Sequence, residues 1–292
     1  MEDRIMKILV LGGTGMVGHV ISLYFSEAGY DVTALTRKHI DYCKYIIGDA
    51  TDSILLKKII EQGNFDIIIN SIGILNEDAD DNKSMSILLN SFLPHFLSDC
   101  TIKMKTKIIH LSTDCVFSGK TGGYTEYSVK DGQSFYDRTK SLGEIDNKKD
   151  LTFRNSIIGP DMNYNGVGLF NWFMKQGTSI NGYSNVFWTG VTTVTLVKAI
   201  EHVIKCNING LYHLVNNSKI SKENLLALFN KYFKNNSVII NSSSTPIIDK
   251  SLINTRKDFD FVVPSYENMI IEMREWIISH NNFYNHYKIM ED

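Results

Sequence analysis

The stretch "SFYDRTKSLGE", residues 134–144, places Tyr136 four positions before Lys140. Residues i and i+4 of a helix lie on one face, so this phenol and this ammonium can enter the same cleft. The nearby cation is expected to favour the phenolate and to lower the Tyr136 pKa from about 10. Tyr136 could then donate a proton to a developing alkoxide near neutral pH.

The spacing alone is weak evidence, because it recurs at Tyr284 and Lys288 in a chain with 14 tyrosines. The second pair lies near the end of the sequence, where we expect a mobile and inert segment. The first pair follows "LSTD", residues 111–114, at the end of an apolar run. Thr113 would lie at the C-terminal end of a strand and point into the same crevice as Tyr136.

A glycine motif supplies a second kind of chemistry. In "LVLGGTGMVGHV", Gly12, Gly15 and Gly18 form GxxGxxG between the first predicted strand and the first predicted helix. Glycines let the turn tighten, and the helix N-terminus adds a partial positive charge that favours a pyrophosphate. Together with the intervening Met16 and Val17, they form the expected dinucleotide-binding loop.

The residues after the second predicted strand indicate which dinucleotide binds. They read Thr36-Arg37-Lys38, with no carboxylate to accept from a ribose 2′-OH. Arg37 and Lys38 can form charge-assisted bonds with a 2′-phosphate. This favours NADP(H), with NADH as the alternative.

Two further strand ends supply expected cofactor contacts. Asp49, with Ala50 after it, could accept a hydrogen bond from an adenine amino group, although an ordinary turn residue is an equal interpretation. "NSIGIL" places Ser71, Ile72 and Gly73 where the chain passes close to the cofactor. A side chain at Gly73 would block that approach.

Short apolar runs rich in Ile and Val position these residues. They are "KILVLG", "DVTAL", "DIIINSIG", "KIIHLST" and "LTFRNSII", separated by stretches long enough for helices. The pattern predicts a doubly wound parallel sheet of the Rossmann type with a smaller, partly interleaved C-terminal substrate domain. We expect residues 1–158 to bind the dinucleotide and residues 159–292 mainly to bind substrate, with about 188–218 returning to the first domain. "SMSILLNSFLPHFLSDC" should be one helix kinked at Pro94.

The composition limits the partners. A net charge of -2 and a pI near 6.4 argue against binding to nucleic acid or to an anionic membrane. The sequence has no long apolar span or cleavable leader, and its four cysteines form no CxxC, so we expect a cytoplasmic location. No His or Cys spacing suggests a metal. A homodimer, common among soluble proteins, remains open.

Seven motifs in order resemble the extended short-chain dehydrogenase/reductase superfamily, and within it the dTDP-4-dehydrorhamnose reductase-like sugar-nucleotide reductases. The motifs are "GGTGMVG", "INSIGIL", "LSTDCVFSG", "FYDRTKSLGE", "RNSIIGP", "WTGVTT" and "GLYHLVN". The resemblance implies that Thr113 holds the substrate carbonyl, Tyr136 is the acid and Lys140 bonds the nicotinamide ribose. It also implies reduction by NADPH of the 4-keto group of a nucleotide-diphosphate-linked 6-deoxyhexos-4-ulose, giving an activated L-deoxysugar.

The motifs "NSIGILN" and "STDCVFSG" look most like relatives that reduce UDP-2-acetamido-2,6-dideoxy-4-keto sugars. A dTDP- or UDP-linked 4-keto-rhamnose is the other substrate considered. Besides Thr113, the expected substrate contacts are Asp114, Arg154, Asn171, Trp188 and Arg256, because guanidinium suits phosphate and an aromatic plane suits a base. The alternatives are an epimerase with retained NAD and a non-catalytic dinucleotide-binding regulatory subunit.

Overall fold

The structure, a computed structural model, describes residues 4–206 and 208–289. It divides into two compact units. Unit 1 comprises Met1–Val116, Lys130–Arg154 and Ile200–Tyr212. Unit 2 comprises Phe117–Val129, Asn155–Ala199 and His213–Asp292. The chain therefore enters unit 2 at Phe117–Val129 and returns to unit 1 at Ile200–Tyr212.

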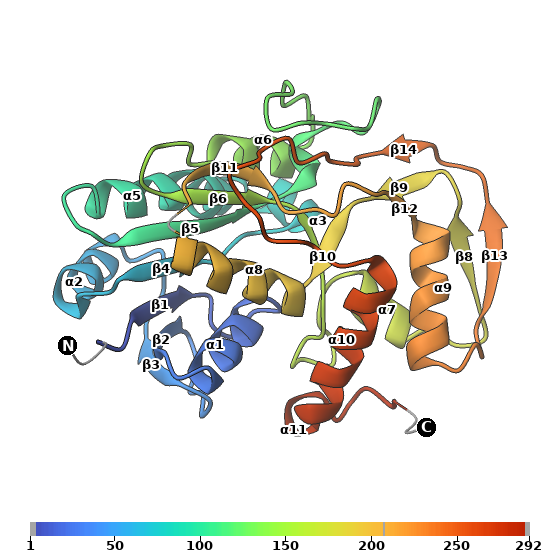
Figure 1. Cartoon of the computed structure of the whole chain (residues 1–292), viewed down its shortest axis with the longest axis horizontal. Helices are drawn as coiled ribbons and strands as arrows, with labels where there is room; N and C mark the ends of the chain where they lie inside the picture. Colours follow the sequence, from blue (N-terminus) through green and yellow to red (C-terminus); the bar gives the residue numbers. More distant parts are fainter. Residues whose placement is uncertain (1–3, 207, 290–292) are drawn as a thin grey trace. The chain divides into compact units, whose positions relative to one another are not determined.

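A seven-stranded sheet in the order β11-β6-β5-β4-β1-β2-β3 forms the centre of unit 1 (Figure 1). β1 pairs in parallel with both β2 and β4, and β5 pairs in parallel with β4 and β6. The strand order therefore reverses beside β1, which is where such sheets bind ligands at the carboxyl ends of their strands. The predicted doubly wound α/β fold is confirmed. The strands are β1 Lys7–Leu11, β2 Asp31–Thr36, β3 Lys44–Ile47, β4 Ile67–Asn70, β5 Lys107–Ser112, β6 Leu151–Arg154 and β11 Gly210–His213.

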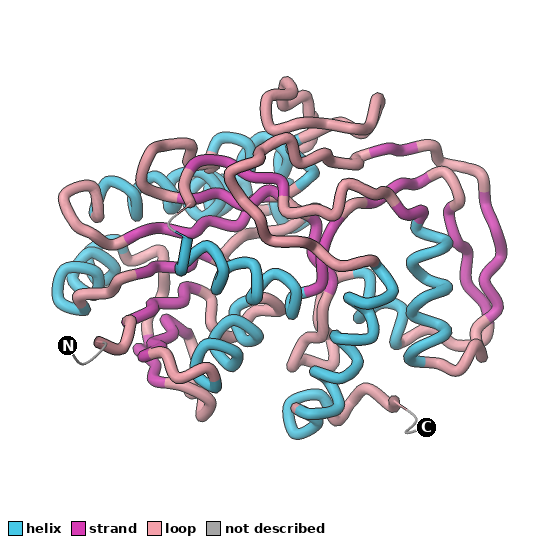
Figure 2. Tube along the Cα trace, in the orientation of Figure 1, coloured by secondary structure: helices cyan, strands magenta, loops and turns pink. Residues whose placement is uncertain are grey.

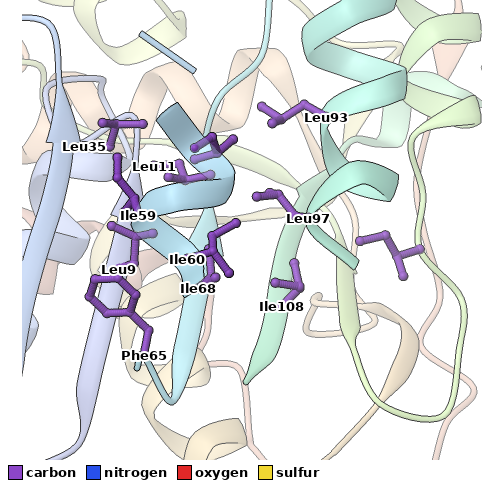
Figure 3. Packing of buried hydrophobic residues seen from close by; sticks show 12 residues of the cluster. Leu9, Leu11, Leu35, Ile59, Ile60, Phe65, Ile68, Leu93, Leu97 and Ile108 are labelled. Carbon is purple, nitrogen blue, oxygen red and sulfur yellow. The ribbon is translucent and has the colours of Figure 1, made fainter. Parts of the chain in front are cut away.

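Helices flank this sheet, shown in cyan beside the magenta strands in Figure 2. On one face, the core packs Ile59 and Ile60 of α2 and Leu97 of α5 against strand residues such as Leu9 and Ile108 (Figure 3). Burying each such side chain contributes roughly 1.5–3 kcal/mol, which is why the continuous apolar runs form covered strands. The helical segments are α1 Gly18–Glu27, α2 Ser53–Gly63, α3 Asn76–Asp81, α4 Lys83–Ser86, η1 Ile87–Phe92, α5 Leu93–Cys100, η2 Asp114–Val116 and α6 Phe135–Leu142.

The expected single helix around Pro94 is instead three segments. α4 leads into a π-helical turn, η1, and Pro94 lies in the first turn of α5. Proline has no N–H to donate four residues back, and its ring crowds the carbonyl of Asn90. The expected kink therefore takes the form of a π-helical turn before the proline. This turn brings the main chain of Asn90 toward α6. A Cβ built on Gly143, just after α6, would lie 1.9 Å from Asn90 O.

Unit 2 is assembled from small sheets and helices. β10 pairs in parallel with β7, β13 pairs in parallel with β8, and β9 lies between β12 and β14. α8, Thr193–Cys206, begins in unit 2 and ends in unit 1. The other elements are β7 Ser156–Ile158, α7 Leu169–Met174, β8 Ser179–Tyr183, β9 Val186–Trp188, β10 Gly190–Thr192, β12 Ile220–Ser221, α9 Lys222–Phe233, β13 Ile239–Ser243, β14 Ile248–Asp249, α10 Tyr266–Ser279 and α11 Asn281–Tyr284.

The expected strand "LTFRNSII" is divided. β6 ends at Arg154 and β7 begins at Ser156, so the two halves pair in different sheets on either side of Asn155. Ser221 caps the N-terminus of α9, because its Oγ accepts from Asn224 N at 3.1 Å. In the described part of the chain, every helix is too short or too polar to span a bilayer.

Candidate functional site

The glycine loop joins β1 to α1 through a tight turn. Gly15 N donates to Gly12 O at 2.9 Å, and Gly12 has a φ of 84°. A Cβ on Gly18 would lie 2.0 Å from Gly12 O, so only glycine fits this close approach. Gly15 is exposed, whereas Met16 and Val17 beside it are half-buried. This cradle fits a pyrophosphate at the N-terminus of α1.

The end of β2 presents two exposed cations, Arg37 and Lys38. Asp49 lies near Arg37, and its pKa is lowered mainly by hydrogen bonds from Thr51, with a smaller contribution from Arg37. Asp49 therefore forms its own turn with Thr51, while Ala50 beside it is half-buried. The turn interpretation of Asp49 has support, and its exposed carboxylate is still accessible to a ligand.

The end of β4 lies directly against the glycine loop. A Cβ on Gly12 would lie 3.0 Å from Ser71 Oγ and from Ile72 Cγ1. Ser71 Oγ donates to Leu11 O at 2.6 Å, which ties β4 to β1. Gly73 is exposed, and a Cβ there would lie 3.9 Å from Lys140 Nζ. The three residues of "SIG" thus connect the glycine loop to the predicted catalytic helix.

Helix α6 carries Tyr136 and Lys140 on one face, as predicted. The helix begins with a capping box in which Ser134 Oγ accepts from Asp137 N and Asp137 accepts from Ser134 N. This cap fixes the first turn and therefore the position of Tyr136. Tyr136 and Lys140 are 7% and 4% exposed, so both side chains project into the protein.

Thr113 and Tyr136 are brought together. Thr113 lies just beyond β5, is 8% exposed, and forms a side-chain hydrogen bond with Tyr136. Thr113 Oγ1 also donates to Asp114 Oδ1 at 3.2 Å and accepts from Cys115 N at 3.1 Å. The hydroxyl that is expected to hold a carbonyl therefore lies beside the phenol that is expected to protonate it.

The expected direction of the Tyr136 pKa shift is wrong. Burial raises the pKa of Tyr136, and the neighbouring Cys115 and Asp114 raise it further, while the Thr113 hydrogen bond lowers it. Desolvation disfavours the phenolate more than any neighbouring group favours it. The structure thus holds Tyr136 as a neutral phenol, which is the protonation state that a proton donor requires.

Lys140 points to the end of β5. Its Nζ donates to Leu111 O at 2.8 Å, and burial lowers the pKa of Lys140 to about 8, against an opposing effect of Glu144. The side chain therefore remains mostly protonated at neutral pH. Its ammonium lies near Gly73, where the chain was expected to pass close to a cofactor.

Arg154 has a different role from the one expected. It is 1% exposed, and its Nε and Nη2 donate to both carboxylate oxygens of Glu144 at 2.8 and 2.7 Å. Ser112 Oγ and Lys130 Nζ also bond this carboxylate, at 2.7 and 3.1 Å. The expectation that Arg154 contacts a diphosphate is corrected, because its guanidinium is part of a buried ion pair that supports β5 and α6.

Two residues of unit 2 that were expected to contact the substrate are buried and make contacts within the protein. Asn171 is 1% exposed, and its Nδ2 donates to Gly159 O at 3.1 Å and to Val167 O at 2.6 Å. Trp188 is 3% exposed, and its ring packs against that of Tyr266 with centroids 5.7 Å apart. The expectation that these two side chains contact the substrate is therefore corrected: both have a packing role.

Arg256 remains accessible. Its side chain is 23% exposed, and its Nε and Nη2 donate to Asp258 at 3.0 and 2.7 Å. Asp114 of unit 1 is 5% exposed and accepts from Thr113, so its expected substrate contact would be made beside that hydroxyl.

Sequence reasoning missed Asn90, which connects two parts of the candidate site. The side chain is fully buried in η1. Its Oδ1 accepts from Ile74 N and its Nδ2 donates to Ile74 O, both at 2.9 Å, and Nδ2 also lies 3.2 Å from Thr139 Oγ1 on α6. The sequence signal for this role was a single amide side chain, Asn90, within the apolar run "SILLNSFL".

Tyr42 is a second missed residue. Its hydroxyl donates to Gly13 O at 2.7 Å and so ties the segment after Arg37 and Lys38 to the glycine loop. Nothing in the local sequence around Tyr42 indicates this bond, because the two residues are 29 positions apart.

The site therefore combines a glycine-lined βα turn at the switch point of a doubly wound sheet with Thr113 just beyond β5 and with Tyr136 and Lys140 on α6. Residues 6–247 match the family described as RmlD substrate binding domain. The chain belongs to this family, and the predicted resemblance to dTDP-4-dehydrorhamnose reductases is confirmed.

Named relatives agree with this assignment. A dTDP-4-dehydrorhamnose reductase of Mycobacterium tuberculosis (strain CDC 1551 / Oshkosh) is 28% identical over 150 residues, 49% of this chain and 46% of that one. The spore coat polysaccharide biosynthesis protein SpsK of Bacillus subtilis (strain 168) is 28% identical over 216 residues, 72% of this chain and 73% of that one. The match spans about half the length of the Mycobacterium tuberculosis relative.

Solved structures show the same fold. A dTDP-4-dehydrorhamnose reductase from Bacillus anthracis str. Ames, solved in complex with NADP, has a TM-score of 0.79 and 17% identity, covering 92% of this chain and 99% of that one. At this identity the likeness concerns the fold alone.

Proposed function

We propose that this protein is an NADPH-dependent reductase of the 4-keto group of a nucleotide-linked 6-deoxy sugar. One observation carries the proposal: Thr113 bonds Tyr136, and Lys140 lies between the end of β5 and Gly73. Thr113 and Gly73 follow the carboxyl ends of β5 and β4, at the edge of the sheet where the glycine loop begins after β1, and α6 brings Tyr136 and Lys140 to them. A proton donor and a dinucleotide-binding turn at the same carboxyl edge of one sheet support a reaction between a bound dinucleotide and a carbonyl substrate.

The cofactor, when bound, supplies a hydride to the carbonyl carbon. Gly12, Gly15, Met16, Val17 and Gly18 would hold its pyrophosphate at the N-terminus of α1. Lys140 would bond the nicotinamide ribose, as the family resemblance implies. Ser71, Ile72, Gly73, Asp49 and Ala50 would line the remainder of the cofactor site.

NADPH is preferred in this proposal because Arg37 and Lys38 are exposed at the end of β2, where they could bond a 2′-phosphate. The NADP complex of the Bacillus anthracis reductase is consistent with this choice. A dehydratase of the same fold was solved with NAD, so NADH remains the alternative.

Thr113 would hold the substrate carbonyl by a hydrogen bond, and Tyr136 would transfer its phenolic proton to the carbonyl oxygen as the C–H bond forms. The raised pKa keeps the proton on Tyr136 until an alkoxide develops. Lys140, still protonated at neutral pH, would then stabilise the phenolate that remains. The products are an alcohol and the oxidised cofactor.

The substrate carries a nucleoside diphosphate in this proposal. Relatives named dTDP-4-dehydrorhamnose reductase and the probable low-salt glycan biosynthesis reductase Agl14 of Haloferax volcanii support sugar reduction as the reaction class. A UDP-2-acetamido-2,6-dideoxy-4-keto sugar and a dTDP- or UDP-linked 4-keto-rhamnose are the two candidates. Arg256 is the remaining accessible candidate for contact with the substrate.

The decisive experiment measures NADPH oxidation with a panel of UDP- and dTDP-linked 4-keto-6-deoxy sugars, with the product identified by NMR. Stoichiometric oxidation and an alcohol at C4 are expected. Tightly held NAD with no net consumption would instead identify an epimerase. Dinucleotide binding without turnover on any sugar would identify a regulatory subunit.

We also propose a homodimer, built on the helices beside the candidate site. Phe92 and Leu142 are 49% and 69% exposed, and their helices lie together where His95 Nε2 bonds Leu142 O at 2.7 Å. Met85 and Ile87 are also exposed on the same run of helices. Large apolar side chains grouped on adjacent helices are typical of a protein interface. Sedimentation equilibrium tests this, because a monomer at micromolar concentration would contradict it.

A further inference from the structure

Unit 2 contains a cavity of about 230 Å³ whose lining is strongly basic. Four of its residues are Lys175, Lys234, Lys288 and His286. Tyr164 and Tyr287 contribute aromatic walls. All of these residues belong to unit 2, and none has a role in the proposed reduction.

Within residues 4–206 and 208–289, the three lysines of the cavity form no ion pair. In the described residues, Lys175, Lys234 and Lys288 have no carboxylate partner, whereas Lys198, Lys219 and Lys231 of the same unit each have one. Burial lowers the pKa of His286 below its usual value, and Lys175 lowers it further, while Asp161, buried nearby, opposes this shift. Three ammonium groups near one carboxylate leave this cavity with a positive potential, which concentrates anions.

Neighbouring contacts hold the lining in place. Lys234 Nζ donates to Met174 O at 2.9 Å and to Gln176 O at 3.0 Å, which leaves one of its three N–H groups for a ligand. Tyr287 accepts from Asp161 N at 2.8 Å and donates to Asn171 Oδ1. The polar part of the cavity is therefore preorganised, which reduces the entropy lost when a ligand binds.

Size and chemistry together limit the ligand. Sites for drug-sized molecules occupy roughly 300–1,000 Å³, so this cavity suits a ligand smaller than a nucleotide-linked sugar. Ammonium groups bind phosphate oxygens through charge-assisted hydrogen bonds. The tyrosines offer apolar faces with polar tips, which suit a ring that carries hydroxyls. Lys175 Nζ lies 5.2 Å from the centre of the Tyr164 ring, so cation and ring are adjacent.

We propose that this cavity binds the phosphate monoester of a small sugar. The phosphate would contact Lys175, Lys288 and the remaining N–H of Lys234. The sugar would lie against Tyr164. This binding is independent of the proposed reduction, because it requires neither the dinucleotide nor Tyr136.

Calorimetry of the full chain with glucose 1-phosphate, inorganic phosphate and glucose tests the proposal. The double variant K175Q/K288Q removes two exposed cations of the cavity, whereas K231Q removes a cation that pairs with Glu267 outside the cavity. We expect saturable binding of glucose 1-phosphate, about tenfold or more weaker in K175Q/K288Q and unchanged in K231Q. Inorganic phosphate and glucose should each bind more weakly than the ester.

Absence of saturable binding at millimolar glucose 1-phosphate would overturn the proposal, as would equal loss in K175Q/K288Q and K231Q. Inorganic phosphate binding as tightly as the ester would show that the site takes the free anion. NMR titration of His286 gives an independent measurement. Its pKa should rise when the ester binds, because an anion favours the imidazolium over the opposing effect of Lys175. An unchanged His286 pKa would contradict ligand binding in this cavity.

Discussion

Two segments of this protein carry a tyrosine four residues before a lysine, yet their surroundings differ completely. Tyr136 and Lys140 both lie inside unit 1 on α6, with Thr113 bonded to the phenol. Tyr284 ends α11 in unit 2 and is fully buried, whereas Lys288 lies beyond the helix and is exposed. The same spacing places both side chains on one face only where one continuous helix carries them, as α6 does and α11 does not.

The second pair also corrects an expectation. The segment near Tyr284 is packed against the rest of unit 2. Trp276 Nε1 donates to Tyr284 OH at 3.1 Å, and Tyr284 is 0% exposed. An aromatic side chain packed against α10 anchors this part of the chain. The hydroxyl of Tyr284 thus has a structural role, whereas that of Tyr136 lies beside a second polar hydroxyl.

The largest predicted difference comes from removing one oxygen from each tyrosine. Tyr136→Phe should lower kcat by about 10²–10⁴, because the proton donor is lost. Tyr284→Phe should leave kcat unchanged and lower the free energy of unfolding by about 0.5–1.5 kcal/mol, because Trp276 loses an acceptor. Steady-state kinetics and urea unfolding of both variants make the comparison. Unchanged turnover in Tyr136→Phe would refute the proposed mechanism.

The ion pair that supports α6 should matter more than one on the surface. Arg154→Met leaves Glu144 buried without its guanidinium and should lower the free energy of unfolding by about 3–5 kcal/mol. Arg256→Met breaks a pair whose partner Asp258 is 60% exposed, so about 0–1 kcal/mol is expected. Urea unfolding measures both variants. Equal losses would mean that the buried pair has no special role.

Lys140 provides a pH-dependent test. Its folded pKa of about 8 lies below the unfolded value of 10.5, so the unfolded state binds more protons between these values. Wild-type stability should therefore rise with pH across this window by up to about 3 kcal/mol more than that of Lys140→Met. Urea unfolding from pH 7 to 10.5 measures the difference. Burial also lowers the pKa of Lys107 to about 8, but this effect is common to both proteins and cancels. Parallel curves would contradict the buried ammonium.

The same group should affect catalysis. In the wild type, kcat/KM reports groups of the free enzyme and should fall as pH rises through about 8, when Lys140 loses its proton. Lys140→Met should be much less active than the wild type at neutral pH. A profile flat from pH 7 to 9.5 would argue against a role for the ammonium.

The smallest effect is expected at Lys288. Because this side chain is exposed, Lys288→Met should change the free energy of unfolding by no more than about 0.5 kcal/mol and leave reductase kinetics unchanged. Thermal unfolding and steady-state kinetics suffice as measurements. A loss of activity comparable with that of Lys140→Met would break the distinction between the two pairs.

The parts of the fold that could be predicted are those encoded locally. Continuous apolar runs predicted β1, β2, β4 and β5, and the chain turns after α1 at Gly29, whose φ is 86°. The run across Arg154 and Ser156 was misread as one strand, because periodicity cannot show that the chain changes sheets at Asn155. The glycine loop and the α6 pair were found because backbone conformation and helix spacing depend on neighbouring residues.

Residue types and spacing alone determined the strands β1, β2, β4 and β5, the tight glycine turn and the position of Tyr136 and Lys140 on one helix face. Only the tertiary structure decided that Arg154, Asn171 and Trp188 are used inside the protein, that Asn90 links Ile74 to α6, and that the Tyr136 pKa rises. Local conformation depends on adjacent residues, whereas desolvation and long-range hydrogen bonds depend on which distant side chains meet. The same chemical group can therefore bind a ligand or stabilise a core, and the packing around it determines which.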